Sequence, residues 1–337
     1  MLNGGVIGFG NIGQQLTRHI GEAWRGRARI VAACNRGPTN LAVARDRFSL
    51  AVTHDPDELL AMGLDFVLVT STSAAHASQV EAAARRGIAV FCEKPIALTL
   101  EDADRAIAAA ERAGIVNVVN YSLRFIEAYR TIRDLARSGE LGRVLAVHHL
   151  RTRGYGLYEA GARHRAVVEP DESGGWTVHH ACHDIDLLSW LHGPIARVYA
   201  RAATTVPGGA SEELVLGLVD FTDGAVGSIG DSVCRIREHM TLVVGSRASL
   251  AMSGEAGSTV LRLHREGSDR SEPMPARDEK RPGGGLDHFL ECVRAGRQSS
   301  DSLRSARHSL AVALAMRESA RTGGPIDVPR EEPPDRP

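Results

Sequence analysis

The sequence predicts a two-domain α/β protein in which a doubly wound parallel sheet is followed by an α/β domain with a mostly antiparallel sheet. The chain has 337 residues, which is longer than most chains that fold around a single hydrophobic core. Over roughly the first 120 residues, short apolar runs alternate with helical patterns, as in parallel sheets covered by helices. From about residue 196 onward, several apolar runs follow one another with little helix between them, which is typical of antiparallel sheets.

In the first domain, helical patterns separate short apolar runs that are candidate strands. These runs cover residues 6–9, 29–34, 65–70, 88–92 and 115–119. In the first helical segment, apolar residues recur every four positions from Ile12 to Trp24. Two later segments, 74–86 and 101–113, each stop at a glycine, which can adopt the left-handed conformation that ends helices. This order predicts a first domain over residues 1–121.

The second domain is predicted over residues 122–330. It is expected to contain a bridging helix over about 124–138 and one long helix over about 175–191. Its candidate strands cover residues 196–204, 213–221, 225–233, 240–244 and 250–252. Two helices, over about 286–295 and 302–322, follow them, and the Pro- and charge-rich tail 331–337 is expected to be disordered.

Charge and composition argue against several classes of function. The net charge is −1 and no basic block is present, so we expect no nucleic-acid partner. No apolar run approaches the roughly 20 residues that span a bilayer, so we expect no membrane association. The N-terminus enters a candidate strand at once, and the five cysteines are scattered without a CxxC pair, as in proteins with reduced thiols. A cytoplasmic location is therefore expected.

The segment Gly8-Phe9-Gly10-Asn11-Ile12-Gly13 has the spacing G-x-G-x-x-G and lies between an apolar strand and a helix. In a dinucleotide-binding turn, the first glycine permits the tight turn and the second lets the backbone approach the pyrophosphate. The third lets helix and strand pack closely, and the helix N-terminus holds the anion. A glycine-rich turn without a cofactor is the alternative, but the flanking strands and helix fall where the motif requires them. The sequence therefore predicts an NAD(P) site.

The residues after the second candidate strand bear on which dinucleotide binds. An Asp or Glu there would accept hydrogen bonds from the ribose 2′-hydroxyl of NAD, but this chain has Asn35 and Arg36. Asparagine does not repel a phosphate, and Arg36 can pair with one, so NADP is favoured. NAD stays possible because asparagine can also bond a 2′-hydroxyl, and a solvent-facing loop arginine is the simpler interpretation of Arg36.

Lysine is nearly absent from this chain, because only Lys94 and Lys280 among its 40 basic residues are lysines. Lys280 lies in a polar Gly/Pro-rich stretch and is interpreted as a solvated loop residue. Lys94 follows a candidate strand, within Glu93-Lys94-Pro95, at the edge where open α/β sheets bind ligands. A lysine can be desolvated until its pKa suits proton transfer, whereas arginine keeps its proton. Lys94 is therefore predicted to be catalytic, and a surface ammonium is the alternative.

A second polar cluster lies on the predicted long helix. His179, His183 and Asp186 are spaced i, i+4 and i+7, so they are expected to share one helix face while apolar residues pack on the other side. Two histidines and an acid on one face favour a functional site over a solvated surface. Zinc is a competing interpretation, because His-x₃-His is a ligand spacing. No HExxH motif or third-ligand cluster accompanies it, so no metal is expected.

With these residues, the chain resembles the glucose–fructose oxidoreductase/inositol dehydrogenase/rhizopine-catabolism (Gfo/Idh/MocA) family along nearly its whole length. The resemblance rests on the glycine turn, the His76 segment, Glu93-Lys94-Pro95, Arg124-Phe125, the glycine-led histidine helix and the late strands. It implies a Rossmann domain followed by an α/β domain whose open sheet commonly mediates homodimers or homotetramers. It also implies reversible oxidation of a secondary alcohol on a sugar, cyclitol or related polyol.

The resemblance implies roles for single residues. Lys94 resembles the family's catalytic lysine, bonded to the reacting oxygen, and His183 resembles its general acid/base. His179, four residues before His183, completes the predicted catalytic set. With the motifs above, the expected cofactor contacts are Gly8, Phe9, Gly10, Asn11, Ile12, Asn35, Arg36, Thr70, Ser71, His76, Glu93, Lys94 and Asn120. The expected substrate contacts are Lys94, Arg124, Trp176, His179 and His183.

One position departs from the family pattern. The family often has Asp four residues before the catalytic histidine, and this chain has His179 there. A neutral histidine supports a charged lysine less well than an acid does, so Glu93 or Asp186 is expected to compensate. The resulting hypothesis places the substrate alcohol between Lys94 and His183, one of which accepts its proton while hydride passes to the nicotinamide.

Two other functions compete with a plain dehydrogenase or reductase. One is a cofactor-binding regulator without turnover, against which the presence of Lys94 and His183 argues. The other is a glycoside-cleaving enzyme that uses tightly held NAD⁺ for transient oxidation and elimination. The second would favour NAD, whereas Asn35-Arg36 favours NADP.

Overall fold

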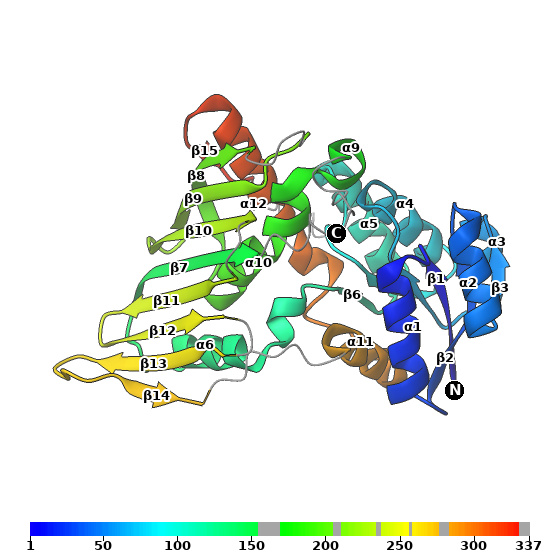
Figure 1. The fold of residues 1–337 in the computed structure, drawn as a ribbon, viewed down its shortest axis with the longest axis horizontal. Coiled ribbons are helices and arrows are strands. Elements are labelled where there is room, and N and C mark those ends of the chain that lie inside the picture. The colour runs from blue at the N-terminus through cyan, green and yellow to red at the C-terminus, as the bar shows by residue number, and fades with distance from the viewer. Residues whose placement is uncertain (154–168, 205–209, 234–236, 256–257, 276–282, 330–337) are drawn as a thin grey trace. The chain divides into compact units, whose positions relative to one another are not determined.

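The computed structural model describes residues 1–153, 169–204, 210–233, 237–255, 258–275 and 283–329. Contacts divide the chain into two compact units (Figure 1). Unit 1 holds Met1–Tyr121 and Pro282–Arg307, and unit 2 holds Ser122–Arg281 and His308–Pro337. The sequence placed all of 122–330 in the second domain, whereas residues 282–307 pack with the first. The predicted tail 331–337 lies outside the described residues.

Unit 1 contains the parallel sheet that the sequence predicted. Its strand order is β3-β2-β1-β4-β5-β6, and every neighbouring pair is parallel. The strands are β1 (Leu2–Ile7), β2 (Ala28–Cys34), β3 (Ala51–Thr53), β4 (Phe66–Val69), β5 (Ala89–Cys92) and β6 (Asn117–Val119). The order reverses between β1 and β4, and in such sheets ligands bind beyond the carboxyl ends of the strands at this point.

The helices of unit 1 follow the alternation read from the sequence. They are α1 (Asn11–Ala23), α2 (Pro38–Phe48), α3 (Pro56–Leu60), α4 (Ser73–Ala84), α5 (Leu100–Arg112) and α11 (Gly284–Ala295). The elements α2, β3 and α3 were not predicted, because β3 and α3 are too short to show a period and α2 carries few apolar residues.

Helix α11 belongs to the core of unit 1 although it comes late in the chain. The ring of its Phe289 lies 6.0 Å from that of Phe66 and 5.7 Å from that of Phe91, on β4 and β5. On its polar side, Asp287 accepts a hydrogen bond from Trp24 Nε1 at 2.6 Å and lies 2.7 Å from His19 Nε2, which ties α11 to α1. Burial of three phenylalanine rings in one cluster is the physical reason that residues 282–307 join the first unit.

Unit 2 is built on a nine-stranded sheet with the order β14-β13-β12-β11-β7-β10-β9-β8-β15. All neighbours are antiparallel except β7 and β10, so the mostly antiparallel prediction is confirmed. The strands are β7 (Val144–Arg153), β8 (Ile195–Ala203), β9 (Leu214–Phe221), β10 (Val226–Val233), β11 (His239–Gly245), β12 (Ala248–Gly254), β13 (Val260–Arg265), β14 (Glu272–Met274) and β15 (Ile326–Asp327).

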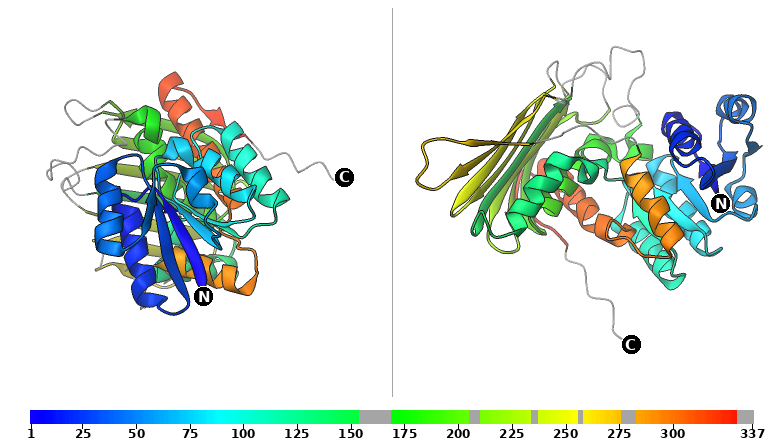
Figure 2. Two further views of the ribbon diagram at one scale, coloured as in Figure 1. Left: turned by 90° about the vertical axis from the view of Figure 1, so that its right-hand side faces the viewer. Right: turned by 90° about the horizontal axis from the view of Figure 1, so that it is seen from below.

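The helices of unit 2 lie against one face of this sheet. They include η1 (Ser122–Phe125), α6 (Glu127–Arg137), α9 (Pro170–Ser173), the π-helical turn η2 (Thr177–Ala181), α10 (Cys182–Leu191) and α12 (Leu303–Thr322), whose first residues belong to unit 1. Figure 2 shows the sheet edge-on, with no described helix on its other face. In the described part of the chain, none of the helices combines the length and the apolar character that a bilayer crossing needs.

Candidate active site

Each glycine of the turn after β1 has the surroundings that its predicted role requires. Gly8 has φ +95°, and a Cβ there would lie 2.4 Å from the backbone N of Ser71. A Cβ on Gly13 would lie 2.7 Å from the carbonyl oxygen of Gly8, so α1 packs closely against the turn. A Cβ on Gly10, the residue that precedes α1, would meet no atom within 4 Å. The turn is therefore open at the one position where a pyrophosphate must approach the backbone, and the residues present fit a dinucleotide.

The end of β2 presents amide and guanidinium groups at the positions where an acid would bind ribose. Asn35 donates through Nδ2 to the carbonyl oxygen of Gly37 at 3.1 Å, which fixes the orientation of its side chain. The carbonyl oxygen of Asn35 accepts from His54 Nδ1 at 3.0 Å, and the next side chain, Arg36, is exposed.

The loops after β4 and β5 are joined through His76. Its Nδ1 donates to the carbonyl oxygen of Pro95 at 2.7 Å, and its Nε2 lies 3.3 Å from the carbonyl oxygen of Ser71. Burial lowers the pKa of His76, so the imidazole is held neutral as a connection between backbones. Thr70 donates to the carbonyl oxygen of Gly8 at 2.7 Å, which attaches the same loop to the glycine turn.

Lys94 lies directly after β5, and its side chain is buried, with 8 % exposed. The preceding Glu93 accepts a hydrogen bond from Asn120 Nδ2 at 2.6 Å, and Asn120 follows β6. Three predicted residues therefore lie together at the carboxyl edge of the sheet. The Glu93 side chain thus connects the ends of the neighbouring strands β5 and β6.

The histidine segment, residues 176–184 in unit 2, differs from the continuous helix that the sequence predicted over 175–191. Gly174 and Gly175 have φ +90° and +77°, so no regular helix runs through them. The π-helical turn η2 follows, and α-helical geometry begins only at Cys182. A π-turn contains one more residue per turn than the α-helix, which shifts the face on which later side chains lie.

Asp186, unlike the two histidines, does not lie on an exposed part of the segment. His179 and His183 are partly exposed, whereas Asp186 is 1 % exposed. Its carboxylate accepts from Arg124 Nε at 2.7 Å and Nη2 at 2.5 Å, and from Ser309 Oγ at 2.8 Å. The predicted compensation of the missing acid by Asp186 is therefore wrong, because this carboxylate is already neutralised by a bidentate arginine.

Two of the predicted substrate contacts have internal partners. Arg124 is the arginine that binds Asp186, and Trp176 is fully buried with its indole N–H donated to Asp231 Oδ1 at 3.0 Å. Both side chains thus have structural roles in unit 2. The apolar side of the segment packs as predicted, through the buried residues Val178, Cys182, Ile185 and Leu188.

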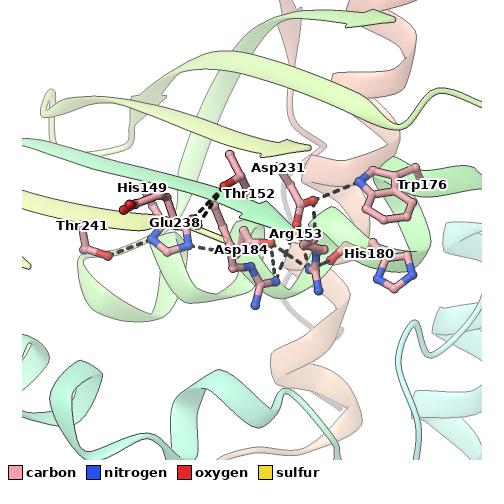
Figure 3. Close-up of polar contacts among 10 residues, drawn as sticks. His149, Thr152, Arg153, Trp176, His180, Asp184, Asp231, Glu238 and Thr241 are labelled. Atoms are coloured by element: carbon pink, nitrogen blue, oxygen red, sulfur yellow. Dashed lines mark hydrogen bonds and ion pairs between the residues drawn. The ribbon is translucent and has the colours of Figure 1, made fainter. Parts of the chain in front are cut away.

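A buried polar network beneath the histidine segment was missed by the sequence reasoning (Figure 3). On β7, the alternate residues His149, Arg151 and Arg153 lie on the same face of the strand. Asp184 accepts from His149 Nε2 at 2.8 Å, from Arg151 Nη2 at 2.6 Å and from Arg153 Nη2 at 3.4 Å. Arg153 also donates to Asp231 at 2.7 Å. The only signal was the alternation His-x-Arg-x-Arg, which resembles a solvated stretch.

The two carboxylates of the network differ in acidity. Burial opposes ionisation of Asp184, but the charge of Arg151 and the hydrogen bond from His149 hold its pKa well below the usual range. Burial and the neighbouring charge of Asp184 raise the pKa of Asp231 to about 6. Two adjacent carboxylates titrate as a coupled pair, so one remains charged where the other takes up a proton. Among the described residues, no three His, Cys, Asp or Glu side chains gather closely enough to hold a metal ion.

A glycine turn open to a dinucleotide on a doubly wound sheet, followed by a unit with a large antiparallel sheet, defines a two-domain dinucleotide-dependent enzyme class. Residues 2–121 match the model of an oxidoreductase family with an NAD-binding Rossmann fold, and residues 129–251 match the GFO/IDH/MocA C-terminal domain. The chain belongs to the Gfo/Idh/MocA family of oxidoreductases.

Individual relatives agree with this assignment. A 1,5-anhydro-D-fructose reductase from Ensifer adhaerens is 29% identical over 281 residues, which are 81% of either chain. A 2,7-anhydro-N-acetylneuraminate hydratase from Escherichia coli (strain K12) is 27% identical over 270 residues, 78% of this chain and 70% of the relative. A levoglucosan dehydrogenase solved with NADH has a TM-score of 0.85 at 22% identity, covering 98% of this chain and 100% of that one, and it shows the shared fold.

Proposed function

We propose that the chain oxidises a secondary alcohol of a sugar, cyclitol or related polyol, or reduces the corresponding ketone, with a nicotinamide dinucleotide. The observation that carries this proposal is the carboxyl edge of the unit 1 sheet. There the open Gly10 turn, the His76-linked loops and the buried Lys94 lie at the ends of strands. The sugar and anhydrosugar substrates named for the relatives support the substrate class.

The protein's part in this reaction is to bind, orient and handle a proton. When bound, the nicotinamide supplies the acceptor or the donor of hydride. Lys94 donates a hydrogen bond to the reacting oxygen, and its charge stabilises negative charge that develops there. His183 accepts the hydroxyl proton as the carbonyl forms and returns it in the reduction. His179 replaces the acid of many relatives, so Lys94 is not supported by a carboxylate at that position.

Steady-state kinetics of Lys94→Arg test this proposal. Arginine keeps the positive charge but differs in shape and does not exchange its proton, so kcat is expected to fall on the order of 100-fold or more. The dissociation constant of the dinucleotide, measured by fluorescence titration, is expected to stay unchanged. Arg85→Lys, an exchange of the same two residue types at an exposed site, serves as the matched control. Unchanged turnover in Lys94→Arg contradicts the assignment.

We propose NADP as the preferred dinucleotide, with Asn35 and Arg36 beside the ribose. A charge-assisted hydrogen bond contributes about 1.5–3 kcal/mol, so Arg36→Ala is expected to weaken NADPH binding about tenfold or more. NADH lacks the 2′-phosphate, and its dissociation constant is expected to change little. An equal effect of Arg36→Ala on both dinucleotides rejects the preference.

A redox-neutral reaction is the second candidate, and the relative named as a hydratase favours it. Transient oxidation followed by elimination would use the same Lys94 and His183, with the dinucleotide restored at the end of each cycle. The product of such a reaction accumulates without net change in nicotinamide absorbance. Substrate panels of aldoses, keto-sugars, inositols and anhydrosugars, followed by both absorbance and product analysis, separate the two candidates.

We further propose that the chain forms homodimers or homotetramers through the uncovered face of the unit 2 sheet. Exposed apolar side chains lie there on β8, β9, β10 and β11, namely Tyr199, Leu216, Leu218, Val226 and Met240. Exposed apolar side chains that lie together on one face are typical of protein–protein interfaces. Light scattering is expected to give a mass of two or four chains, and Leu218→Glu is expected to lower it.

A further inference from the structure

The histidine segment is bound to side chains of the unit 2 sheet at three points along its length. Before the π-turn, Trp176 donates its indole N–H to Asp231 Oδ1 at 3.0 Å. Within the turn, the carbonyl oxygen of His180 accepts from Arg153 Nη2 at 3.3 Å. After the turn, Asp184 binds Arg151 at 2.6 Å. The partly exposed His179 and His183 therefore lie between residues that buried charged side chains of the sheet hold in place.

Asp231 and Arg153 are the members of the network that join these attachments. Asp231 is 1 % exposed and lies on β10, where its Oδ2 accepts from Arg153 Nη2 at 2.7 Å while its Oδ1 accepts from Trp176. One carboxylate thus orients both the tryptophan before the π-turn and the guanidinium that binds the carbonyl within it. The rings of Trp176 and His180 lie 4.1 Å apart at an angle of 34°, so a movement of the indole also displaces His180 (Figure 3).

The π-turn needs such support. A π-helical turn is less stable than the α-helix that the sequence favours, and two glycines with positive φ precede it. Its first residue, Thr177, is held by Glu212, which accepts from the backbone N at 3.0 Å and from Oγ1 at 2.5 Å. Without the sheet-side contacts, the segment is expected to relax toward α-helical geometry, which rotates the side chains of His179 and His183.

We propose that Asp231 and Arg153 are positioning residues that hold His179 and His183 in the orientation that the reaction requires. They act through Trp176 and the carbonyl of His180. This inference rests on the proposed function, in which His183 handles the substrate proton. It assigns a task in the reaction to a charge pair that lies on the central strands of the sheet and not on the histidine segment itself.

Three variants separate the contacts. Asp231→Ala removes both acceptors, and Asp231→Asn keeps the shape and one acceptor oxygen. Trp176→Phe removes the N–H donor and keeps a smaller aromatic ring beside His180. Asp134→Ala, at an exposed position of α6 in the same unit, is the matched control.

Kinetics give the first readout. Because a displacement of about 1 Å at a reacting group can cost on the order of 100-fold in rate, Asp231→Ala is expected to lower kcat by that order. Asp231→Asn is expected to restore part of it. The KM for the dinucleotide is expected to stay unchanged, because its contacts lie in unit 1. Trp176→Phe combined with Asp231→Ala is expected to cost no more than Asp231→Ala alone, because both changes remove the same contact.

Histidine ring resonances give a second readout that does not depend on turnover. With signals assigned through His179→Asn and His183→Asn, both rings are expected to shift in Asp231→Ala while His19 and His288 of unit 1 do not. Absence of turnover in the wild type would reject the proposed function, but the resonances would still show whether Asp231 orients the two histidines. Unshifted resonances and wild-type kcat in Asp231→Ala overturn the positioning role. If Asp231→Ala does not fold, the same two measurements are made on Asp231→Asn, which conserves the side-chain volume, and on Trp176→Phe, which keeps an aromatic ring.

Discussion

Among single residues, Asp231 is expected to govern how stability depends on pH. Burial and the charge of Asp184 raise its pKa to about 6 in the folded protein. The pKa of an aspartate in the unfolded chain is about 4. A folded pKa above the unfolded one means that the protonated form stabilises the fold. This contribution is complete below about pH 4 and is lost as the pH rises through about 6.

Asp231→Asn imitates the protonated carboxyl and therefore should not lose this contribution. The free energy of unfolding of the wild type, minus that of Asp231→Asn, is expected to fall by on the order of 2–3 kcal/mol between about pH 4 and pH 7. Urea denaturation at a series of pH values measures it, with Asp134→Asn on α6 as the exposed control. A difference that stays constant over this range contradicts the assignment of the titration to Asp231.

Sequence reasoning at this scale predicted residue types better than partners. The positions of Lys94 and the three glycines beside strand ends were predictable, because they depend on the local sequence pattern. The pairing of Arg124 with Asp186 was not predicted, because the two are 62 residues apart and nothing in either segment indicates it. Trp176 was assigned to the substrate, but its partner Asp231 lies 55 residues further along the chain.

At the scale of elements, adding one methyl group at two glycines of the turn before α1 is expected to have two different effects, one on dinucleotide binding and one on stability. Gly10→Ala places a Cβ in open space, so the fold is expected to persist, whereas dinucleotide binding weakens because the methyl group occupies the approach to the backbone. Gly13→Ala places a Cβ 2.7 Å from the carbonyl oxygen of Gly8, so α1 must move and the melting temperature is expected to fall. Thermal unfolding and fluorescence titration of both variants measure the two effects.

The comparison also provides its own control, because the two substitutions are chemically identical and lie three residues apart. Gly21→Ala in the same helix, where a Cβ meets no atom within 4 Å, is expected to change neither binding nor packing. A loss of stability in Gly10→Ala as large as that in Gly13→Ala shows that the turn is not open as described.

Elements with a clear period were predicted and those without one were not. All five candidate strands of the first domain correspond to β1, β2, β4, β5 and β6, with ends displaced by a few residues. β7 was missed because its inward positions are His149, Arg151 and Arg153, which remove the apolar alternation that marks a strand. The π-turn was missed because hydrophobic spacing cannot distinguish one extra residue in a turn from an α-helix.

For the whole molecule, the important feature is that the chain returns to unit 1 after building most of unit 2. The sequence pattern placed 286–295 in the second domain, because a helix that follows other elements is assigned by default to the domain in which it occurs. Only the packing of Phe289 on Phe66 and Phe91, and the contact of Asp287 with α1, assign it to the first unit. Covalent order alone cannot show this.

The fold of unit 1 is therefore expected to require residues from both ends of the chain. A fragment of residues 1–121 would expose the aromatic rings that α11 covers, and the side chain of Asn117 would lose the backbone N–H of Leu303, which it binds at 2.8 Å. Burial of one phenylalanine contributes about 1.5–3 kcal/mol, a large part of the stability of a domain of this size. We expect the fragment to aggregate or to unfold well below the temperature at which the full chain does.

A second fragment that joins residues 1–121 to 283–307 by a flexible glycine–serine linker restores these contacts. It is expected to unfold cooperatively and to bind the dinucleotide with the affinity of the full chain, because the glycine turn, Lys94 and Asn120 are all present. Circular dichroism melting and fluorescence titration of the two fragments decide the matter. If residues 1–121 alone fold and bind the dinucleotide as well as the joined fragment, α11 is not needed for the fold of unit 1, and the first unit ends at residue 121.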